Sequence, residues 1–297
     1  TSNLTDPDAA AAEIAATFIG PKAKSWNSET NARALQMEQA GATPQAIWQE
    51  TGNWKAPDSA WRQEIPDNAA RINENKPIGT NKWIENDIPN VPGTNPVGKV
   101  FDSKHGNALL YHPELPNAYN PLDIATNANI VGSNSLLRSE RGFFDPESKN
   151  ISIFGGLSAD EAKSTMLHEL QHAIQTKEGW SKGGNPASIA QDQARAKARI
   201  GFLNSELSQA AKDLDRFKNG TPEYAAARET YDSAMREKLN ISPSLFQSDS
   251  YDGYRLLAGE AEARATQARR NMTAKERRAK FPAESYDVPI DQLIIRQ

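Results

Sequence analysis

The amino-acid sequence predicts an α+β fold that is mostly helical, with a small sheet and a long inserted helical hairpin. Three observations carry this prediction. Residues 158–178 combine a helix-capping signal with apolar residues at helical spacing, and residues 150–154 alternate as a half-buried strand does. Two long polar runs, about 188–217 and 222–239, are separated by Asn219-Gly220, which is typical of a helical hairpin. The 297 residues suffice for one large domain or two.

The N-terminal part, residues 1–65, predicts a helical segment with a small hairpin. An alanine-rich helix is expected over 8–18 and a second helix over 28–40. Within 43–52, threonine followed by proline predicts the start of a third helix and glycine its end. Two tryptophans flank a turn within 54–61, and we expect them to pack in the core.

Composition excludes several classes of protein. The chain has no cysteine, which rules out disulfides and cysteine-ligated zinc. No apolar run approaches the length of a membrane span and no signal-peptide pattern opens the chain, so we expect no membrane partner. A net charge of -4 argues against nucleic-acid binding as the main role. One basic cluster is interpreted as a solvated helix face, with contact to nucleic acid or an acidic partner as the alternative; it comprises Arg269, Arg270, Lys275, Arg277, Arg278 and Lys280.

An HExxH motif at 168–172 is the strongest chemical signal. His168 and His172 lie four positions apart, so a helix presents both imidazoles on one face, where they can bind one Zn²⁺. Glu169 can take the proton from an attacking water, as the general base of a zinc hydrolase does. A strand at 150–154, a short loop and an HExxH helix follow the order of a zincin core. We therefore expect a zincin-like metallopeptidase core.

Such a site needs a third ligand, and no histidine stands ten residues after His168. The candidates lie in a predicted helix over 254–264, where Glu260 and Glu262 are two positions and about 200° apart, so only one can face the metal. We favour Glu260, because zincins with a downstream glutamate commonly show Glu-x-x-Ala. Glu262 shares that spacing and stays the alternative. The glutamate that does not bind the metal is expected to form a salt bridge or a hydrogen bond to a ligand.

Three further residues are weaker candidates. His105 and His112 have no partner at ligand spacing, so neither is expected to bind the metal. An oxyanion stabiliser besides the metal is also needed, and Tyr254 is our guess, with His112 as a second.

These motifs resemble a known family, the zincin-like large polyvalent protein-associated domain, the twenty-third of that series, found in giant proteins of phages and mobile elements. The resemblance rests on residues 164–175, 178–180, 183–184, 258–264, 267–269 and 287–292. Residues 20–23 and 48–52 are similar to the segment that precedes this domain in such proteins. We accordingly expect an N-terminal segment at 1–65, a linker or wrapping segment at 66–99, and a zincin-like domain at 100–297 with the hairpin inserted at about 187–240.

The resemblance implies a metallopeptidase from a phage or prophage polyvalent protein, located in the virion or, after injection, in the host cytoplasm. Its substrate would be a protein or peptide, including its own parent polypeptide, and the hairpin would contact a phage protein partner. The alternative is a noncatalytic structural or interaction module that retains the metal site. One departure matters: such peptidases often have an acidic residue four positions after the glutamate ligand, and here Arg264 stands there. Because arginine cannot accept an imidazole N–H, another residue must orient the histidine, or Glu260 is the wrong choice.

Overall fold

The computed structural model describes residues 15–67, 69–73, 75, 95–103, 108–131, 141–241, 246 and 249–296. The chain divides into two compact units, which are described separately. The first consists of Thr1–Gly183, Ala258–Asp291 and Ile295–Gln297, and the second of Gly184–Leu257 and Gln292–Ile294. Among the described helices, none has the length and apolar character needed to cross a bilayer.

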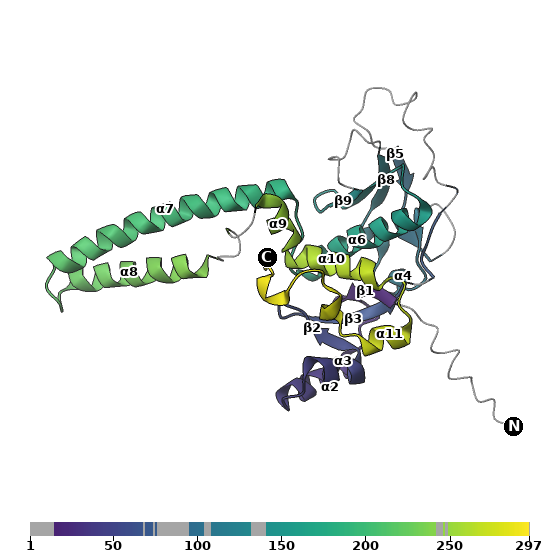
Figure 1. Ribbon diagram of the computed structural model, residues 1–297, viewed down its shortest axis with the longest axis horizontal. Coiled ribbons are helices and arrows are strands. Elements are labelled where there is room, and N and C mark those ends of the chain that lie inside the picture. Colours follow the sequence, from purple (N-terminus) through teal and green to yellow (C-terminus); the bar gives the residue numbers. More distant parts are fainter. Residues whose placement is uncertain are drawn as a thin grey trace. The chain divides into compact units, whose positions relative to one another are not determined.

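The first unit mixes helices with small sheets (Figure 1). Its strands are β1 (Ala15–Ile19), β2 (Asn53–Lys55), β3 (Trp61–Pro66), β4 (Arg71–Ile72), β5 (Asn95–Gly98), β6 (Phe101–Asp102), β7 (Leu110–Tyr111), β8 (Asn127–Val131), β9 (Gly142–Asp145) and β10 (Asn150–Phe154). Its helices are α2 (Ser28–Gln39), α3 (Pro44–Thr51), α4 (Leu115–Ala118), α5 (Pro121–Ile124), α6 (Ala159–Glu178), α10 (Ala258–Arg269), α11 (Ala274–Ala279) and the 3-10 turn η3 (Pro282–Ser285). A second 3-10 turn, η4 (Ile290–Gln292), follows near the C-terminal end.

The described strands form three small sheets, whereas the sequence predicted one. Their orders are β1-β3-β2, β5-β8-β10-β9 and β4-β7-β6. In the four-stranded sheet β10 runs parallel to β8 and antiparallel to β9, so β9 is an outer strand next to the predicted strand at 150–154. The sequence predicted the β2–β3 hairpin of the first sheet, but it did not reveal the sheet β4-β7-β6, whose strands are only two residues long.

Most of the N-terminal elements follow the local signals. Helices α2 and α3, the glycine that ends α3, and the β2–β3 hairpin all lie where they were predicted. The alanine-rich helix expected over 8–18 is wrong at its end, since β1 pairs antiparallel with β3. The paired residues are about fifty positions apart in the sequence, so a long-range contact outweighed the local helix propensity. The start of the expected helix, residues 8–14, lies outside the described residues. Most of the expected linker at 66–99 also lies outside them, and its described part includes β4 and β5.

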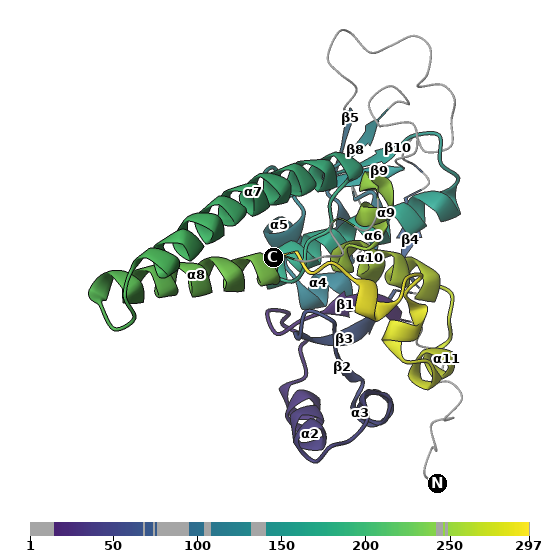
Figure 2. The same ribbon diagram turned by 60° about the vertical axis from the view of Figure 1, so that its left-hand side comes forward.

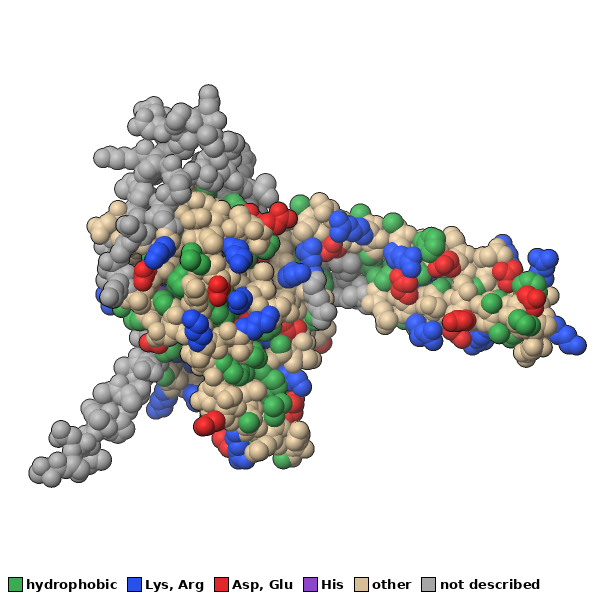
Figure 3. Space-filling view, turned by 180° about the vertical axis from the view of Figure 1, so that it is seen from behind, with side chains coloured by type: hydrophobic (Ala, Val, Ile, Leu, Met, Phe, Trp, Pro, Cys, Tyr) green, Lys and Arg blue, Asp and Glu red, His purple; other side chains and the backbone are tan. Residues whose placement is uncertain are grey.

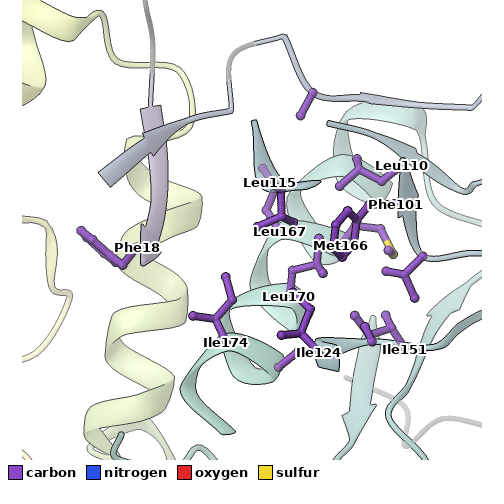
Figure 4. Packing of buried hydrophobic residues seen from close by; sticks show 14 of the residues in the cluster. Phe18, Phe101, Leu110, Leu115, Ile124, Ile151, Met166, Leu167, Leu170 and Ile174 are labelled. Atoms are coloured by element: carbon purple, nitrogen blue, oxygen red, sulfur yellow. The ribbon is translucent and has the colours of Figure 1, made fainter. Parts of the chain in front are cut away.

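The apolar face of α6 forms the centre of the core. Met166, Leu167 and Leu170 are fully buried. Figure 4 shows these side chains turned towards apolar residues of the neighbouring strands and short helices, among them Phe101 and Ile151. Helix α6 contacts β9 and β10, β1, β4 and α10, so it touches all three sheets. Burying this stripe against separate strands fixes the side of α6 that carries the histidines.

Helix α10 packs against α6, and Figures 1 and 2 both place the two helices side by side. Small side chains allow this close approach, with Ala261 and Ala265 fully buried. The predicted helix over 254–264 is interrupted at Leu257, which forms an isolated bridge to Ile294. Residues 254–255 therefore belong to a separate short helix of the second unit.

The basic cluster at 269–280 is not a solvated face throughout, which corrects the sequence interpretation. Arg269 and Arg277 are buried, at 0% and 3% exposure. Arg269 forms an ion pair of 2.6 Å with Glu64 on β3 and also donates to Ser285. These two arginines therefore hold the C-terminal helices to the N-terminal sheet, and neither is available to nucleic acid.

The second unit contains α7 (Pro186–Arg216), α8 (Pro222–Asn240) and α9 (Ser250–Arg255). Helices α7 and α8 form the predicted antiparallel hairpin, with Leu203, Ala210, Ala227 and Ala234 along its buried seam. Figure 3 shows acidic and basic side chains intermingled along the hairpin face visible there, with scattered hydrophobic ones.

Candidate metal centre

Helix α6 presents two histidines because its ends are fixed locally. Ser158 and Glu161 form the predicted capping box at its start, and Gly179, with φ of 79°, ends it in the left-handed conformation. Between these ends, His168 and His172 lie one turn apart on the face that α10 covers. Both side chains are mostly buried, with 13% and 14% exposure.

Three donor atoms converge at this face. His168 Nε2 lies 3.1 Å from His172 Nε2, Glu260 Oε2 lies 3.4 Å from His168 Nε2, and Glu260 Oε1 lies 3.2 Å from His172 Nε2. Ligands about 2.0–2.1 Å from a tetrahedral Zn²⁺ are about 3.3 Å from one another. The two nitrogens are therefore spaced as two ligands of one tetrahedral zinc ion are, and each lies at about that distance from a different oxygen of the Glu260 carboxylate. Among the described residues, His168, His172 and Glu260 are the group whose arrangement could hold a metal ion.

The structure separates the two glutamate candidates. Glu260 faces the imidazoles, whereas Glu262 accepts a hydrogen bond of 3.0 Å from Arg62 on β3 and points away from the histidine pair. Both carboxylates are 2% exposed. Glu262 thus has the salt bridge that was predicted for whichever glutamate does not bind metal.

The charges of the site act on one another strongly. Burial opposes ionisation of Glu260, but the two imidazoles outweigh it and hold the pKa of Glu260 well below its usual range. Burial lowers the pKa of His172, yet the Glu260 charge and hydrogen bond outweigh it and raise that pKa to about 9. The Glu260 carboxylate and the His172 imidazole therefore favour each other's charged forms.

Glu169 lies beside the cluster, on the side of the four-stranded sheet. Its side chain is buried, and burial raises its pKa, although the neighbouring imidazoles oppose this. The backbone N–H of Phe144 on β9 donates a hydrogen bond to its carboxylate. A Cβ at Gly142 would lie 3.2 Å from Glu169 Oε1 and closer still to Thr165, so glycine makes room at the start of β9. Strand β9 therefore holds the predicted general base in place.

Two glycines allow the backbone to approach the centre. A Cβ on Gly183 would overlap Glu260 Oε1 and lie 2.5 Å from His172 Cε1. A Cβ on Gly259 would overlap the backbone of Lys182 and lie 2.5 Å from the nitrogen of Gly183. The loop after α6 therefore passes directly over the three donors, and any larger residue at 183 or 259 would push it away.

A residue that the sequence analysis did not single out contacts one of the candidate ligands. Gln175 Oε1 lies 2.9 Å from His172 Nδ1, and the Gln175 amide nitrogen donates to Gly259 O and to Glu262 Oε1. Arg264 instead pairs with Asp287 at 2.9 Å. The acceptor that Arg264 could not provide is thus supplied by Gln175. Its position three residues after His172, on the same helix face, was the available signal.

Three further candidates, His112, Tyr254 and His105, were named from the sequence. His112 is fully buried, its Nδ1 accepts from the backbone N–H of Leu115, and burial lowers its pKa to about 3, so it is a packed neutral histidine. Tyr254 belongs to α9 in the second unit and its role as oxyanion stabiliser stays a prediction. His105 lies outside the described residues.

The fold and site define a mixed α/β protein with small sheets and a buried His-His-Glu cluster between two packed helices. Residues 16–73 match the family described as large polyvalent protein associated domain 23. The segment from β1 to β4 is therefore similar to a polyvalent-protein-associated domain. The sequence resemblance placed this family's domain at 100–297, whereas the match covers the residues that were expected to precede it and does not reach α6 or α10. No curated protein and no solved structure matches the chain.

Proposed function

We propose that this chain is a zinc-dependent metallopeptidase of a zincin-like kind. The observation that carries the proposal is the convergence of two imidazole nitrogens, 3.1 Å apart, on the Glu260 carboxylate, whose two oxygens lie 3.4 and 3.2 Å from them, with the buried carboxylate of Glu169 beside them. Two imidazoles and a carboxylate form a donor set that suits Zn²⁺ and leave one tetrahedral position for water or substrate.

His168, His172 and Glu260 would hold the metal. When bound, Zn²⁺ supplies Lewis acidity that makes water a better nucleophile and polarises a peptide carbonyl. Glu169 accepts a proton from the attacking water as the new C–O bond forms, and it returns that proton to the nitrogen as the C–N bond breaks. Burial raises the pKa of Glu169, which favours a carboxylate that can both accept and return a proton.

A peptide substrate is supported by the strand next to Glu169. Within the described strands, β9 is an outer strand of the four-stranded sheet and contacts α6. An extended peptide can add to such an edge through backbone hydrogen bonds, which would place a carbonyl beside the general base. The family match of residues 16–73 supports a setting in a phage or mobile-element polyvalent protein, with the parent polypeptide as one candidate substrate.

The same match also favours a second candidate, a noncatalytic module of a virion or injected protein that retains the metal site. Metal content alone does not separate the two functions, because a protein with either function would bind the ion. An assay of peptide hydrolysis separates them. The protein should be purified without added zinc, analysed for metal, and incubated with a panel of unfolded proteins and with its own longer precursor, with and without chelator.

Glu169→Gln is the decisive variant. It should keep stoichiometric zinc and lose at least about a hundredfold of the cleavage rate, because the amide cannot accept the proton. Glu147→Gln, an exposed carboxyl-to-amide change in the turn after β9, is the matched control and should cleave normally. Full turnover by Glu169→Gln would show that Glu169 is not the general base. Stoichiometric zinc with no cleavage of any protein by the unaltered chain would favour the noncatalytic module.

A further inference from the structure

The hydrogen bonds around Gln175 determine which way its amide points. Its nitrogen lies 2.9 Å from Gly259 O and 3.0 Å from Glu262 Oε1. A carbonyl and a carboxylate only accept hydrogen bonds, so the NH₂ group must face them. The amide oxygen must then face His172 Nδ1, 2.9 Å away, and that nitrogen must donate. His172 is consequently held with Nε2 towards His168 and Glu260.

Glu262 is the anchor of this arrangement. Its Oε1 accepts from the side-chain amides of both Gln171 and Gln175, at 3.0 Å each, and its Oε2 accepts from Arg62 Nε at 3.0 Å. Three donors thus surround a carboxylate that is 2% exposed. A buried carboxylate with this many partners stays in one rotamer, because any other would leave donors and charge unpaired.

Arg62 comes from β3 and is itself held rigidly. Asp58 accepts from both of its terminal nitrogens, at 2.9 and 2.8 Å, and the guanidinium lies 3.6 Å over the ring of Trp180. Strand β1 is attached to α6 as well, since Gln171 bonds the backbone of Phe18 through both its amide oxygen and its amide nitrogen. The segment that matches the polyvalent family therefore contacts Glu262 through Arg62 and helix α6 through Phe18.

We propose that Gln175 is a positioning residue for His172 and that Arg62, through Glu262, makes the N-terminal segment a structural component of the metal centre. The inference rests on the proposed function in that it takes the three donors to be metal ligands. It adds a partner for His172 and a reason why residues 16–73 and the HExxH helix occur in one folded unit.

The test measures metal binding by the full chain, through chelator competition for Zn²⁺ and the visible absorption of bound Co²⁺, which reports ligand geometry. Gln175→Met should weaken zinc binding about tenfold or more and change the cobalt spectrum, because residues that orient ligands typically contribute this much. Gln267→Met is the matched control. Gln267 lies on α10, and its half-buried amide donates to Ser164 on α6 rather than to Glu262 or His172, so the zinc affinity of this variant should stay within about twofold.

A conservative variant distinguishes orientation from packing. Gln175→Glu keeps an oxygen for His172 Nδ1 and can share a proton with Glu262, so it should recover most of the affinity lost in Gln175→Met. If Gln175→Met fails to fold, Gln175→Glu still tests the proposal. This variant replaces only the amide NH₂ group and keeps the oxygen that faces His172 Nδ1, so its cobalt spectrum should stay close to that of the unaltered chain. A strongly altered spectrum in folded Gln175→Glu would overturn the proposal.

The contribution of the N-terminal segment is tested with a pair of buried arginines. Arg62→Met should weaken zinc binding several-fold in protein that remains folded, whereas Arg277→Met, an equally buried arginine paired with Glu64, should not. Equal zinc affinity and equal cobalt spectra in Gln175→Met and Gln267→Met, or in Arg62→Met and Arg277→Met, would overturn the inference. An unaltered chain that binds zinc but cleaves nothing would overturn the peptidase alone, and one that binds no metal would overturn both.

Discussion

The pairing of His172 with Glu260 determines how the stability of chelator-treated protein should depend on pH. The folded-state pKa of His172 is about 9, whereas a histidine in the unfolded chain has a pKa of about 6.5. The folded state binds this proton more tightly, so the stabilisation is fully present below pH 6.5 and is lost as the pH rises through 9. At about 1.4 kcal/mol per pH unit, and with His172 still half protonated at pH 9, the free energy of unfolding should fall by about 2 kcal/mol between pH 7 and 9.

The range from pH 7 to 9 also lies above most of the titration of Asp67, another buried group. Burial raises the pKa of Asp67 to about 7, and the stability change from its titration therefore falls mainly below pH 7. The assay is urea unfolding followed by circular dichroism at pH 7, 8 and 9, in chelator and in saturating zinc. Zinc competes with the proton for His172, so the stabilisation by zinc should grow over the same range.

His172→Gln is the control, since it removes the titrating ring and leaves Asp67 in place. In chelator, its stability should vary much less between pH 7 and 9 than that of the unaltered chain. A slope that persists in His172→Gln would assign the effect to another group. The absence of any slope in the unaltered chain would refute the coupling between His172 and Glu260.

Three further predictions concern residues around the site and in the scaffold. Gly183→Ala should weaken zinc binding about tenfold or more in chelator competition, because its Cβ overlaps Glu260 Oε1; unchanged affinity would mean that the loop moves freely. Ser158→Ala removes the N-cap of α6 and should lower the free energy of unfolding by about 1 kcal/mol in urea titrations, with no loss of stability as the contrary result. Arg269→Ala leaves the Glu64 carboxylate buried without its 2.6 Å partner and should cost about 3–5 kcal/mol by the same measurement; a loss below about 1 kcal/mol would contradict the role given to this pair.

Local sequence determined the features that depend on a few neighbouring residues. The Ser158 and Glu161 capping box fixes the start of α6, and Gly179 fixes its end. His168 and His172 then lie on one face because a helix repeats every 3.6 residues. The hairpin turn at Asn219-Gly220 likewise needs no distant partner.

The tertiary structure decided what depends on distant contacts. Spacing alone could not choose between Glu260 and Glu262, since both have alanine three positions later; the choice follows from Arg62 and the two glutamines of α6, which together hold Glu262. Arg269 and Arg277 were predicted to lie on a solvated face because nothing near them in sequence shows that Glu64 on β3 packs against the C-terminal helices. Local patterns report backbone preference and helix face, whereas the partner of a buried charge is set by which elements pack together, and that information is spread over the whole chain.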